Sequence, residues 1–417
     1  MKHILHSISK DRTFRANVVM VGGSFLANVG AYLYHLLMGR LLVPDDYGAL
    51  QSLISLSNIF TVPLLTLNVV VTKFVASFVG RGEPEKISYL FHRLQKILLV
   101  VVFLGGFIFF VFSGTILTFL HIESWVNFLF LDIVLFFGLI ATLNRATLQG
   151  LSNFVSLTVA QFIEAYGKLL LGFIAVTLGF RVTGAFGAFV LIAFVSYIYT
   201  AYVLKPYVSK KEKSTSVSIR SMGKYGLLSF FMTISMVSLY NTDVVLVRHF
   251  FSSYESGLYA ALSVLGKIIF FGSAPVSVAM FPLVAEAHAR GEKYHKIFLK
   301  SMLLILGIAG VATFLFSVYP TIALKILVGE KYLSAAPYLP AFSVFLSLCA
   351  VIYLLVNFFL SIQKVLPAYI IGAAAIAQIV LISLVHPNLS VVILISLSIL
   401  SVLTVVFMTY YVAIAKS

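Results

Sequence analysis

The sequence predicts an all-α polytopic membrane protein with about twelve transmembrane helices in two six-helix lobes. Three observations predict it. Hydrophobic residues make up 61% of the chain and charged residues 10%, and the mean hydropathy is +1.06. Soluble domains carry about 25% charged residues, so lipid must solvate much of this apolar surface. The other two observations are a series of long apolar runs and a pattern that occurs twice.

The apolar runs reach the length of about 20 residues that a helix needs to cross the hydrocarbon core. The first run follows a basic segment without a small-residue cleavage site, so we expect a span and not a signal peptide. Prolines in the second and eighth runs, Pro63, Pro275 and Pro282, are expected to kink or tilt them. The predicted spans are 16–39, 48–78, 92–120, 126–148, 154–179, 183–204, 224–250, 257–287, 298–324, 336–360, 365–385 and 389–414.

A sparse pattern in the first half of the chain returns in the second half, shifted by 208 or 209 positions. The matched pairs are Tyr32 and Tyr240, Arg40 and Arg248, Gly48 and Gly257, and Arg81-Gly82-Glu83 and Arg290-Gly291-Glu292. The repeat predicts an N-terminal lobe over 1–204, a basic cytoplasmic linker over 205–223 and a C-terminal lobe over 224–417. Six spans in each half make the repeats parallel. Two such lobes with a site between them are typical of a secondary transporter.

Loop charges predict the orientation in the membrane. Most of the 29 Lys and Arg residues fall in the loops that share a side with both chain ends. The positive-inside rule therefore places both termini in the cytoplasm, in a bacterial inner membrane or an archaeal plasma membrane. The basic linker also suits the anionic inner leaflet.

Ionisable side chains inside the spans are the first candidate functional residues, because a charge in lipid is costly. Glu164 and Lys168 lie four residues apart on one helical face and can form a structural pair or line a polar pathway. Lys267 lies deep in the eighth span, whereas Lys73 can reach the headgroups. Arg145, at the end of the fourth span, is an interfacial anchor or a binding residue. The basic excess predicts a cationic cavity of Lys168, Lys267, Lys73 and Arg145 for an anionic substrate.

Polar residues at matched places in the two halves are candidates for lining that cavity. Asn28, Tyr32 and His35 form a stripe on one face of the first span. Tyr240 and Asp243 occupy the places of Tyr32 and His35 in the second half. Cavity lining, to which Glu164 would also contribute, and hydrogen bonding between helices both remain open.

Two further roles concern ions and gating. Asp243 either pairs with Arg248 or binds a coupling cation, Na⁺ or H⁺, and Glu164 is the second candidate for ion coupling. Arg40 and Arg248 occupy equivalent outer ends of their spans. There they are predicted to close an outer gate against the nearby acids, which are Asp45, Asp46 and Glu255.

Several enzyme classes find no support in the sequence. It contains no phosphate-binding G-x-x-x-x-G-K-[ST] loop, no H-E-x-x-H motif and no nucleophile elbow. Cys349 is the single cysteine, so no internal disulfide and no Cys/His metal site are expected. We therefore expect a protein that is not an enzyme and needs no cofactor. Transport would depend on ion gradients, membrane potential or a downhill substrate gradient.

Two segments resemble those of a known family. Gly39-Arg40-Leu41-Leu42-Val43-Pro44-Asp45-Asp46-Tyr47-Gly48 resembles the R-x-L-x-P-x-x-Y/F-G opening of the polysaccharide transporter family. These proteins are Wzx-like lipid-linked oligosaccharide flippases of the MATE-like MOP superfamily. The residues Asp243–Leu246 and Gly257–Ala261 are similar to that family's seventh-span pattern.

The resemblance implies two six-helix bundles in a V around a central cationic cavity, with alternating access. The implied cargo is a prenyl-pyrophosphate-linked oligosaccharide, moved from the cytoplasmic to the outer leaflet for surface polysaccharide or glycan assembly. Partners would be this lipid, the bilayer and other glycan-assembly membrane proteins, with no nucleic acid. Two alternatives stay open: a cation-coupled multidrug or small-solute antiporter of the same superfamily, and a membrane glycan polymerase or ligase.

Overall fold

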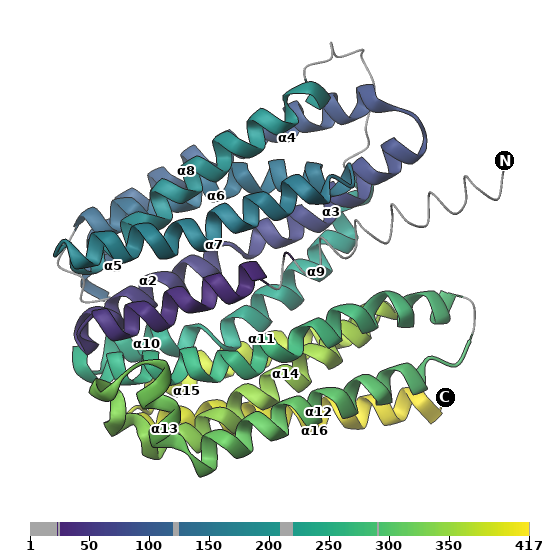
Figure 1. The fold of residues 1–417 in the computed structure, drawn as a ribbon. Coiled ribbons are helices and arrows are strands. Elements are labelled where there is room, and N and C mark those ends of the chain that lie inside the picture. The colour runs from purple at the N-terminus through teal and green to yellow at the C-terminus, as the bar shows by residue number, and fades with distance from the viewer. Residues whose placement is uncertain (1–22, 24–25, 120–124, 209–219, 290–291, 417) are drawn as a thin grey trace. The chain divides into compact units, whose positions relative to one another are not determined.

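The computed structural model describes residues 23, 26–119, 125–208, 220–289 and 292–416, and every regular element in this part is helical (Figure 1). The chain forms two compact units. The first comprises the described parts of Met1–Leu42 and Pro63–Gly226, and the second comprises Val43–Val62 and the described parts of Leu227–Ser417. The segment Val43–Val62 thus belongs to the unit formed mainly by the C-terminal half.

This division differs from the predicted lobes in the placement of Val43–Val62. Of the predicted linker over 205–223, residues 209–219 lie outside the described part of the chain. Its first residues end one helix, Arg181–Val208, and its last residues begin the next, Arg220–Leu239. The two six-helix lobes and the linker stay predictions.

The described part of the first unit consists of helices. Its elements are a helix over 26–41, α3 (Val62–Gly80), α4 (Pro84–Val111), α5 (Ser113–Phe119), α6 (Trp125–Gly150), α7 (Phe154–Thr177) and α8 (Arg181–Val208). Short turns join α3 to α4, α6 to α7 and α7 to α8. Val71, Leu90 and Leu143 belong to one buried cluster that joins α3, α4 and α6. Gly150 permits this packing, since a Cβ there would lie 2.6 Å from Cβ of Val75.

The second unit is arranged around one buried helix, α14 (Leu339–Ser361), which packs against α11, α12 and α16. Phe345, Cys349 and Phe358 of α14 are all fully buried. The other elements are α2 (Pro44–Phe60), α9 (Arg220–Leu239), which belongs to this unit from Leu227 on, α10 (Thr242–Phe250), α11 (Ser253–Ala289), α12 (His295–Val318), α13 (Pro320–Leu327), the 3₁₀ helix η1 (Glu330–Tyr338), α15 (Leu366–Leu384) and α16 (Leu389–Lys416).

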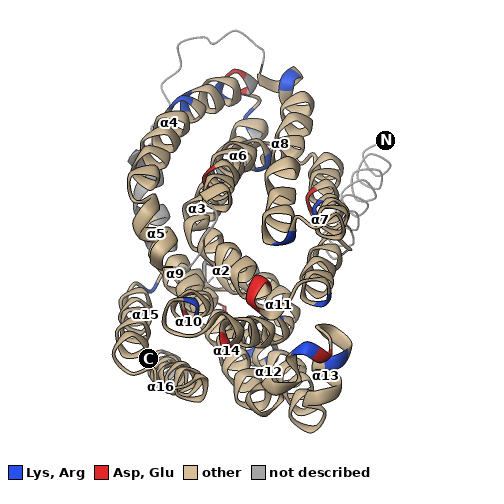
Figure 2. Ribbon diagram, turned by 90° about the vertical axis from the view of Figure 1, so that its left-hand side faces the viewer, with Lys and Arg blue, Asp and Glu red and all other residues tan. Residues whose placement is uncertain are grey.

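The helices have the length and surface of membrane spans. Among the described residues, ten helices are long and apolar enough to cross a bilayer, or eleven if α9 and α10 form one bent span. Large apolar side chains are exposed on them, such as Phe103 at 68% and Phe107 at 67% on α4. Charged residues are sparse on the ribbons of Figure 2. The protein is therefore an all-α polytopic membrane protein, and the count of twelve spans stays a prediction because the expected first span, 16–39, is described only in part.

Several predicted spans are interrupted. The run 48–78 is two helices, α2 and α3, because Pro63 has no N–H to continue the hydrogen-bond ladder of α2. The run 298–324 divides at Tyr319 for the same reason, and Pro320 begins α13. The run 92–120 divides at Phe112, and 224–250 divides at residues 240 and 241 with a bend of 43°. By contrast, α11 is continuous through Pro275 and Pro282.

Candidate functional site

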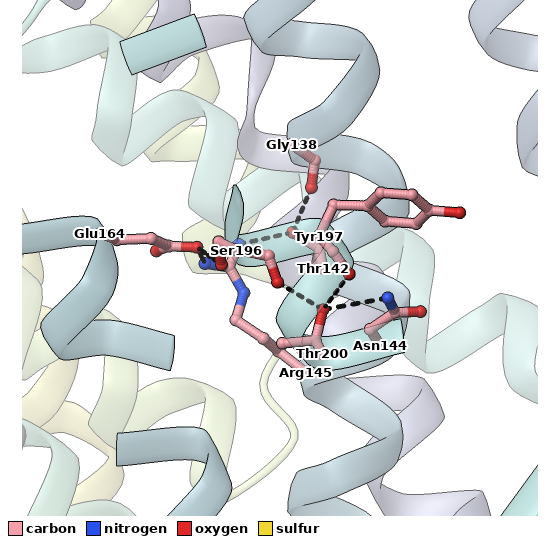
Figure 3. A network of polar contacts seen from close by, with 8 residues as sticks. All are labelled: Gly138, Thr142, Asn144, Arg145, Glu164, Ser196, Tyr197 and Thr200. Carbon is pink, nitrogen blue, oxygen red and sulfur yellow. Dashed lines mark hydrogen bonds and ion pairs between the residues drawn. The ribbon is translucent and has the colours of Figure 1, made fainter. Parts of the chain in front are cut away.

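The first unit contains a polar network that joins three helices (Figure 3). Arg145 of α6 forms a charged hydrogen bond with Glu164 of α7. The same carboxylate oxygen accepts a hydrogen bond from Oγ of Ser196 on α8, at 2.6 Å. The side chains of Arg145 and Glu164 are 22% and 30% exposed, so this ion pair is shielded from solvent on most sides.

Neutral side chains extend the network along α6 and α8. The guanidinium of Arg145 also donates to Oγ1 of Thr142 at 3.2 Å. Asn144 donates its amide to Oγ1 of Thr200 at 3.0 Å, and the Thr200 hydroxyl donates to the Ser196 carbonyl at 2.8 Å. The sequence singled out Arg145 and Glu164 but proposed Lys168 as the partner of Glu164, and here Glu164 is bound by Arg145 instead. Packing of α6 on α7, which helical spacing does not encode, brings the two together.

Lys168 contacts aromatic rings. Its Nζ lies 5.0 Å from the ring centroid of Phe189 and 5.9 Å from that of Tyr34, within the range of cation–π attraction. Tyr34 is fully buried and donates its hydroxyl to the Ala185 carbonyl at 2.9 Å. Gly172 leaves the space that the Tyr34 ring occupies, because a Cβ there would be 2.8 Å from it. Lys168 is half-buried, and the groups that contact its ammonium here are the neutral rings of Tyr34 and Phe189.

The other predicted residues of the first unit are dispersed. Asn28 and Arg40 are exposed, while Tyr32 and His35 are half-buried. The rings of His35 and Tyr34 meet edge to face at 5.7 Å. Lys73 lies on α3, and its side chain is outside the described part of the structure. The predictions that these residues line a cavity or bind substrate remain predictions.

The second unit has its own polar cluster, at the break between α9 and α10. Asn241 is fully buried at this break and donates its amide to the Val237 carbonyl at 3.0 Å. Its Oδ1 accepts a hydrogen bond from the Lys267 ammonium of α11, also at 3.0 Å. The same ammonium lies 5.8 Å from the centroid of the Tyr240 ring. Lys267 is therefore fixed by an amide and an aromatic ring.

Asp243 follows the same break directly, in the first turn of α10, and is 1% exposed. The hydroxyl of Tyr259 on α11 donates to its Oδ2 at 2.7 Å. Its Oδ1 accepts no hydrogen bond from any described residue. The Tyr259 hydroxyl is thus the described partner of this carboxylate, and the two roles that the sequence left open for Asp243, pairing with Arg248 and binding a coupling cation, stay predictions.

Arg248 lies near the N-terminus of α2. Arg248 and α2 both belong to the second unit. This arginine is 5% exposed and interacts electrostatically with Asp45 and Asp46 in the first turn of α2. Glu255 has a different task, since its carboxylate accepts hydrogen bonds from the backbone N–H and the hydroxyl of Ser252. These contacts cap the N-terminus of α11. The predicted outer gate of Arg40 and Arg248 remains a prediction.

Close to Arg248, α2 and α11 pack backbone to backbone. A Cβ on Gly257 would lie 2.1 Å from the Pro44 carbonyl oxygen, and one on Gly48 would lie 2.8 Å from the Gly257 nitrogen. Gly48 and Gly257 are matched positions of the sequence repeat.

Among the neutral members of the two clusters, sequence reasoning singled out Tyr240 but assigned no role to Ser196, Asn241 or Tyr259. Ser196, Asn241 and Tyr259 carry no charge and lie in apolar runs, where hydroxyl and amide groups are ordinary. Asn241 had one available signal, because it is directly followed by Thr242-Asp243, and Asn and Asp favour helix starts. Across the described residues, no three His, Cys, Asp or Glu side chains are grouped as metal ligands.

Solved structures of known proteins share this fold. An inward-facing multidrug resistance MATE family transporter of the MOP superfamily has a TM-score of 0.74 and 16% identity, over 92% of this chain and 95% of that one. The lipid II flippase MurJ in an inward closed conformation has a TM-score of 0.71 and 11% identity, over 95% of this chain and 87% of that one. A MOP superfamily transporter from Pyrococcus furiosus, described as having a binding pocket of reverse polarity, has a TM-score of 0.63 and 15% identity. The match covers 96% of this chain and 95% of that one. The fold is therefore the MATE-like fold of MOP superfamily transporters.

The sequence itself identifies the family. Residues 37–337 match the family of polysaccharide biosynthesis proteins, and the chain belongs to this family. The resemblance drawn from the segment around Pro44 and from that around Asp243 is thereby confirmed. A comparison with curated protein sequences gives no match.

Proposed function

We propose that this protein is a flippase that carries a prenyl-pyrophosphate-linked oligosaccharide from the cytoplasmic to the outer leaflet. The glycan would serve surface polysaccharide assembly, in line with the polysaccharide biosynthesis family. A fold shared with a lipid II flippase supports transport of a lipid-linked sugar. A cell membrane location with both termini in the cytoplasm belongs to the same proposal.

The observation that carries the proposal is the environment of the two intramembrane lysines. The ammonium groups of Lys168 and Lys267 contact aromatic rings and an amide oxygen, and among the described residues neither forms a direct ion pair with a carboxylate. Lys168 in the first unit and Lys267 in the second are therefore cations held by neutral groups. A pyrophosphate cannot enter hydrocarbon unescorted, because an unpaired charge there costs many kcal/mol. Cations of this kind are what such a head group requires.

A flipping assay tests this function. Full-length protein in liposomes would be offered a fluorescent prenyl-pyrophosphate oligosaccharide, and its transfer between leaflets measured. We expect protein-dependent flipping, reduced about tenfold or more in Lys168→Ala and in Lys267→Ala, because one charge-assisted contact is worth about 1.5–3 kcal/mol. The matched control is Lys325→Ala on α13, because the Lys325 side chain is 60% exposed and its ammonium pairs with Glu330.

Other outcomes would contradict the proposal. Flipping unchanged in both intramembrane variants, with folding intact, would exclude these lysines as the binding groups. Uptake of organic cations in place of the pyrophosphate lipid would favour the cation-coupled antiporter of the same superfamily. Transfer of glycan between lipid carriers by the purified protein would point to a polymerase or ligase.

A further inference from the structure

We infer that a pocket between α4, α6 and α8 of the first unit is a binding site for the phosphate head group of an anionic phospholipid. The occupant is a lipid of the surrounding bilayer and differs from the cargo proposed above. The inference therefore does not depend on the flippase.

The pocket lies near one end of the first unit. There α4 begins at Pro84 and α8 ends at Val208, and Oγ of Ser88 on α4 donates to the Val208 carbonyl at 2.7 Å. The pocket has a volume of about 390 Å³, within the range of about 300–1,000 Å³ that is usual for small-molecule sites. The cytoplasmic orientation proposed above places this end at the inner leaflet, which carries anionic lipids. The polar side chains that line the pocket are those of His92, Gln95, Asn144, Tyr197, Tyr202 and Lys205.

The charge of the lining favours an anion. Lys205 contributes an ammonium group, and neither Asp nor Glu is among the residues that line the pocket. Lys205 forms no ion pair within the described part of the chain. A cation without a partner acid attracts a negatively charged ligand, and lysine binds phosphate as a point charge.

Hydrogen-bond donors in the lining lack acceptors. Asn144 is 1% exposed, and its amide nitrogen, which carries two N–H groups, donates one bond, to Thr200 (Figure 3). The second N–H has no acceptor among the described residues. The amide of Gln95 and the hydroxyls of Tyr197 and Tyr202 likewise form no hydrogen bond with any described residue. Phosphate oxygens are strong acceptors, so a phosphate group supplies what these donors require.

The apolar surface next to the pocket favours a lipid over free phosphate. Tyr202 is 78% exposed, and Ile198 and Phe194, one and two turns earlier on the same face of α8, are exposed as well. A lipid whose phosphate occupies the pocket can lay its acyl chains along this face, whereas free phosphate would leave the face uncovered. An anionic head group fits better than a zwitterionic one, which would bring a second cation close to Lys205.

The test measures binding of phosphatidylglycerol to the full-length protein in detergent by native mass spectrometry. Phosphatidylcholine with the same acyl chains is the zwitterionic reference. Lys205→Gln removes the ammonium, and Lys96→Gln is its matched control, because Lys96 is exposed on α4 but does not line the pocket. Ala201→Phe fills the pocket with a ring, and Ala193→Phe adds the same ring to α8 outside the lining.

We expect wild type to bind phosphatidylglycerol about fivefold more tightly than phosphatidylcholine, and Lys205→Gln to lose about this factor, as is usual for one lysine facing an anionic lipid. Ala201→Phe should weaken binding of phosphatidylglycerol about tenfold or more, because the ring competes for the same volume. Lys96→Gln and Ala193→Phe should bind as wild type does. Lys205 is exposed, so Lys205→Gln remains a valid test if the ring at position 201 prevents folding.

Four results would overturn the inference. The first is equal binding of the two lipids by wild type, and the second is equal affinity of Lys205→Gln and Lys96→Gln for phosphatidylglycerol. The third is displacement of phosphatidylglycerol by an equal concentration of inorganic phosphate, since the acyl chains would then contribute nothing. The fourth is displacement by an equal concentration of farnesyl pyrophosphate, which would make the pocket a site for cargo. None of the other measurements involves a prenyl lipid, so failure of the flippase would leave them unchanged.

Discussion

Replacing Gly257 with alanine is expected to destabilise the second unit by about 3 kcal/mol or more, whereas Gly272→Ala on the same helix is expected to be neutral or slightly stabilising. A Cβ at position 257 would lie 2.1 Å from the oxygen and 2.5 Å from the carbon of the Pro44 carbonyl. These are backbone atoms, so α2 as a whole would have to move away from α11. Overpacking of this kind typically costs 1–3 kcal/mol when side chains can adjust, and backbone contacts are less forgiving.

The Gly272→Ala control separates the effect of the contact between Gly257 and Pro44 from the effect of replacing a helical glycine by alanine. No heavy atom lies within 4 Å of a Cβ built on Gly272, and alanine is favoured over glycine in a helix by about 1 kcal/mol. Thermal unfolding of the purified proteins in the same detergent gives the comparison. Equal stability of Gly257→Ala and Gly272→Ala would mean that α2 and α11 do not pack as closely as the structure shows.

The second large effect is expected at the Arg145–Glu164 pair. Glu164→Met leaves the Arg145 charge without its partner, and breaking a buried pair costs about 3–5 kcal/mol. The lower end is expected here, because the two side chains are 22% and 30% exposed. The double variant Arg145→Met with Glu164→Met should be more stable than the sum of the single losses predicts, since it removes both charges and leaves apolar groups of similar length.

A double-mutant cycle on thermal or denaturant unfolding measures this coupling, which is about 1–3 kcal/mol for contacting residues. The Lys325–Glu330 pair supplies a matched cycle, because its side chains are 60% and 69% exposed and their coupling should be small. Additive losses at Arg145 and Glu164 would show that the pair does not stabilise the packing of α6 on α7.

The sequence allowed the class of fold to be predicted, because composition and long apolar runs are direct consequences of a lipid environment. It also marked Glu164, Lys267 and Asp243 as ionisable positions inside the membrane spans. It did not show their partners. The i,i+4 spacing of Glu164 and Lys168 is a local property, whereas the contact between Glu164 and Arg145 depends on how α6 packs on α7.

Proline positions likewise predicted some helix breaks correctly and others not. Pro63 and Pro320 stand in the first turn of new helices, where the missing N–H costs nothing. Pro275 and Pro282 have the same local chemistry but lie within a continuous α11. Prolines are tolerated inside membrane helices where the surrounding protein satisfies the freed backbone groups, and that support is a tertiary property.

The place of α2 also has a consequence for biosynthesis. Tyr47, Leu50 and Leu53 of α2 are buried in a unit whose other helices come from the second half of the chain. At about 5–20 residues per second, α11 leaves the ribosome roughly ten to forty seconds after α2. For that interval the inner face of α2 is without its final neighbour and must be shielded by lipid or by an insertion factor. A nascent chain stopped between the two helices would therefore be a target for membrane quality control, however complete its own first unit is.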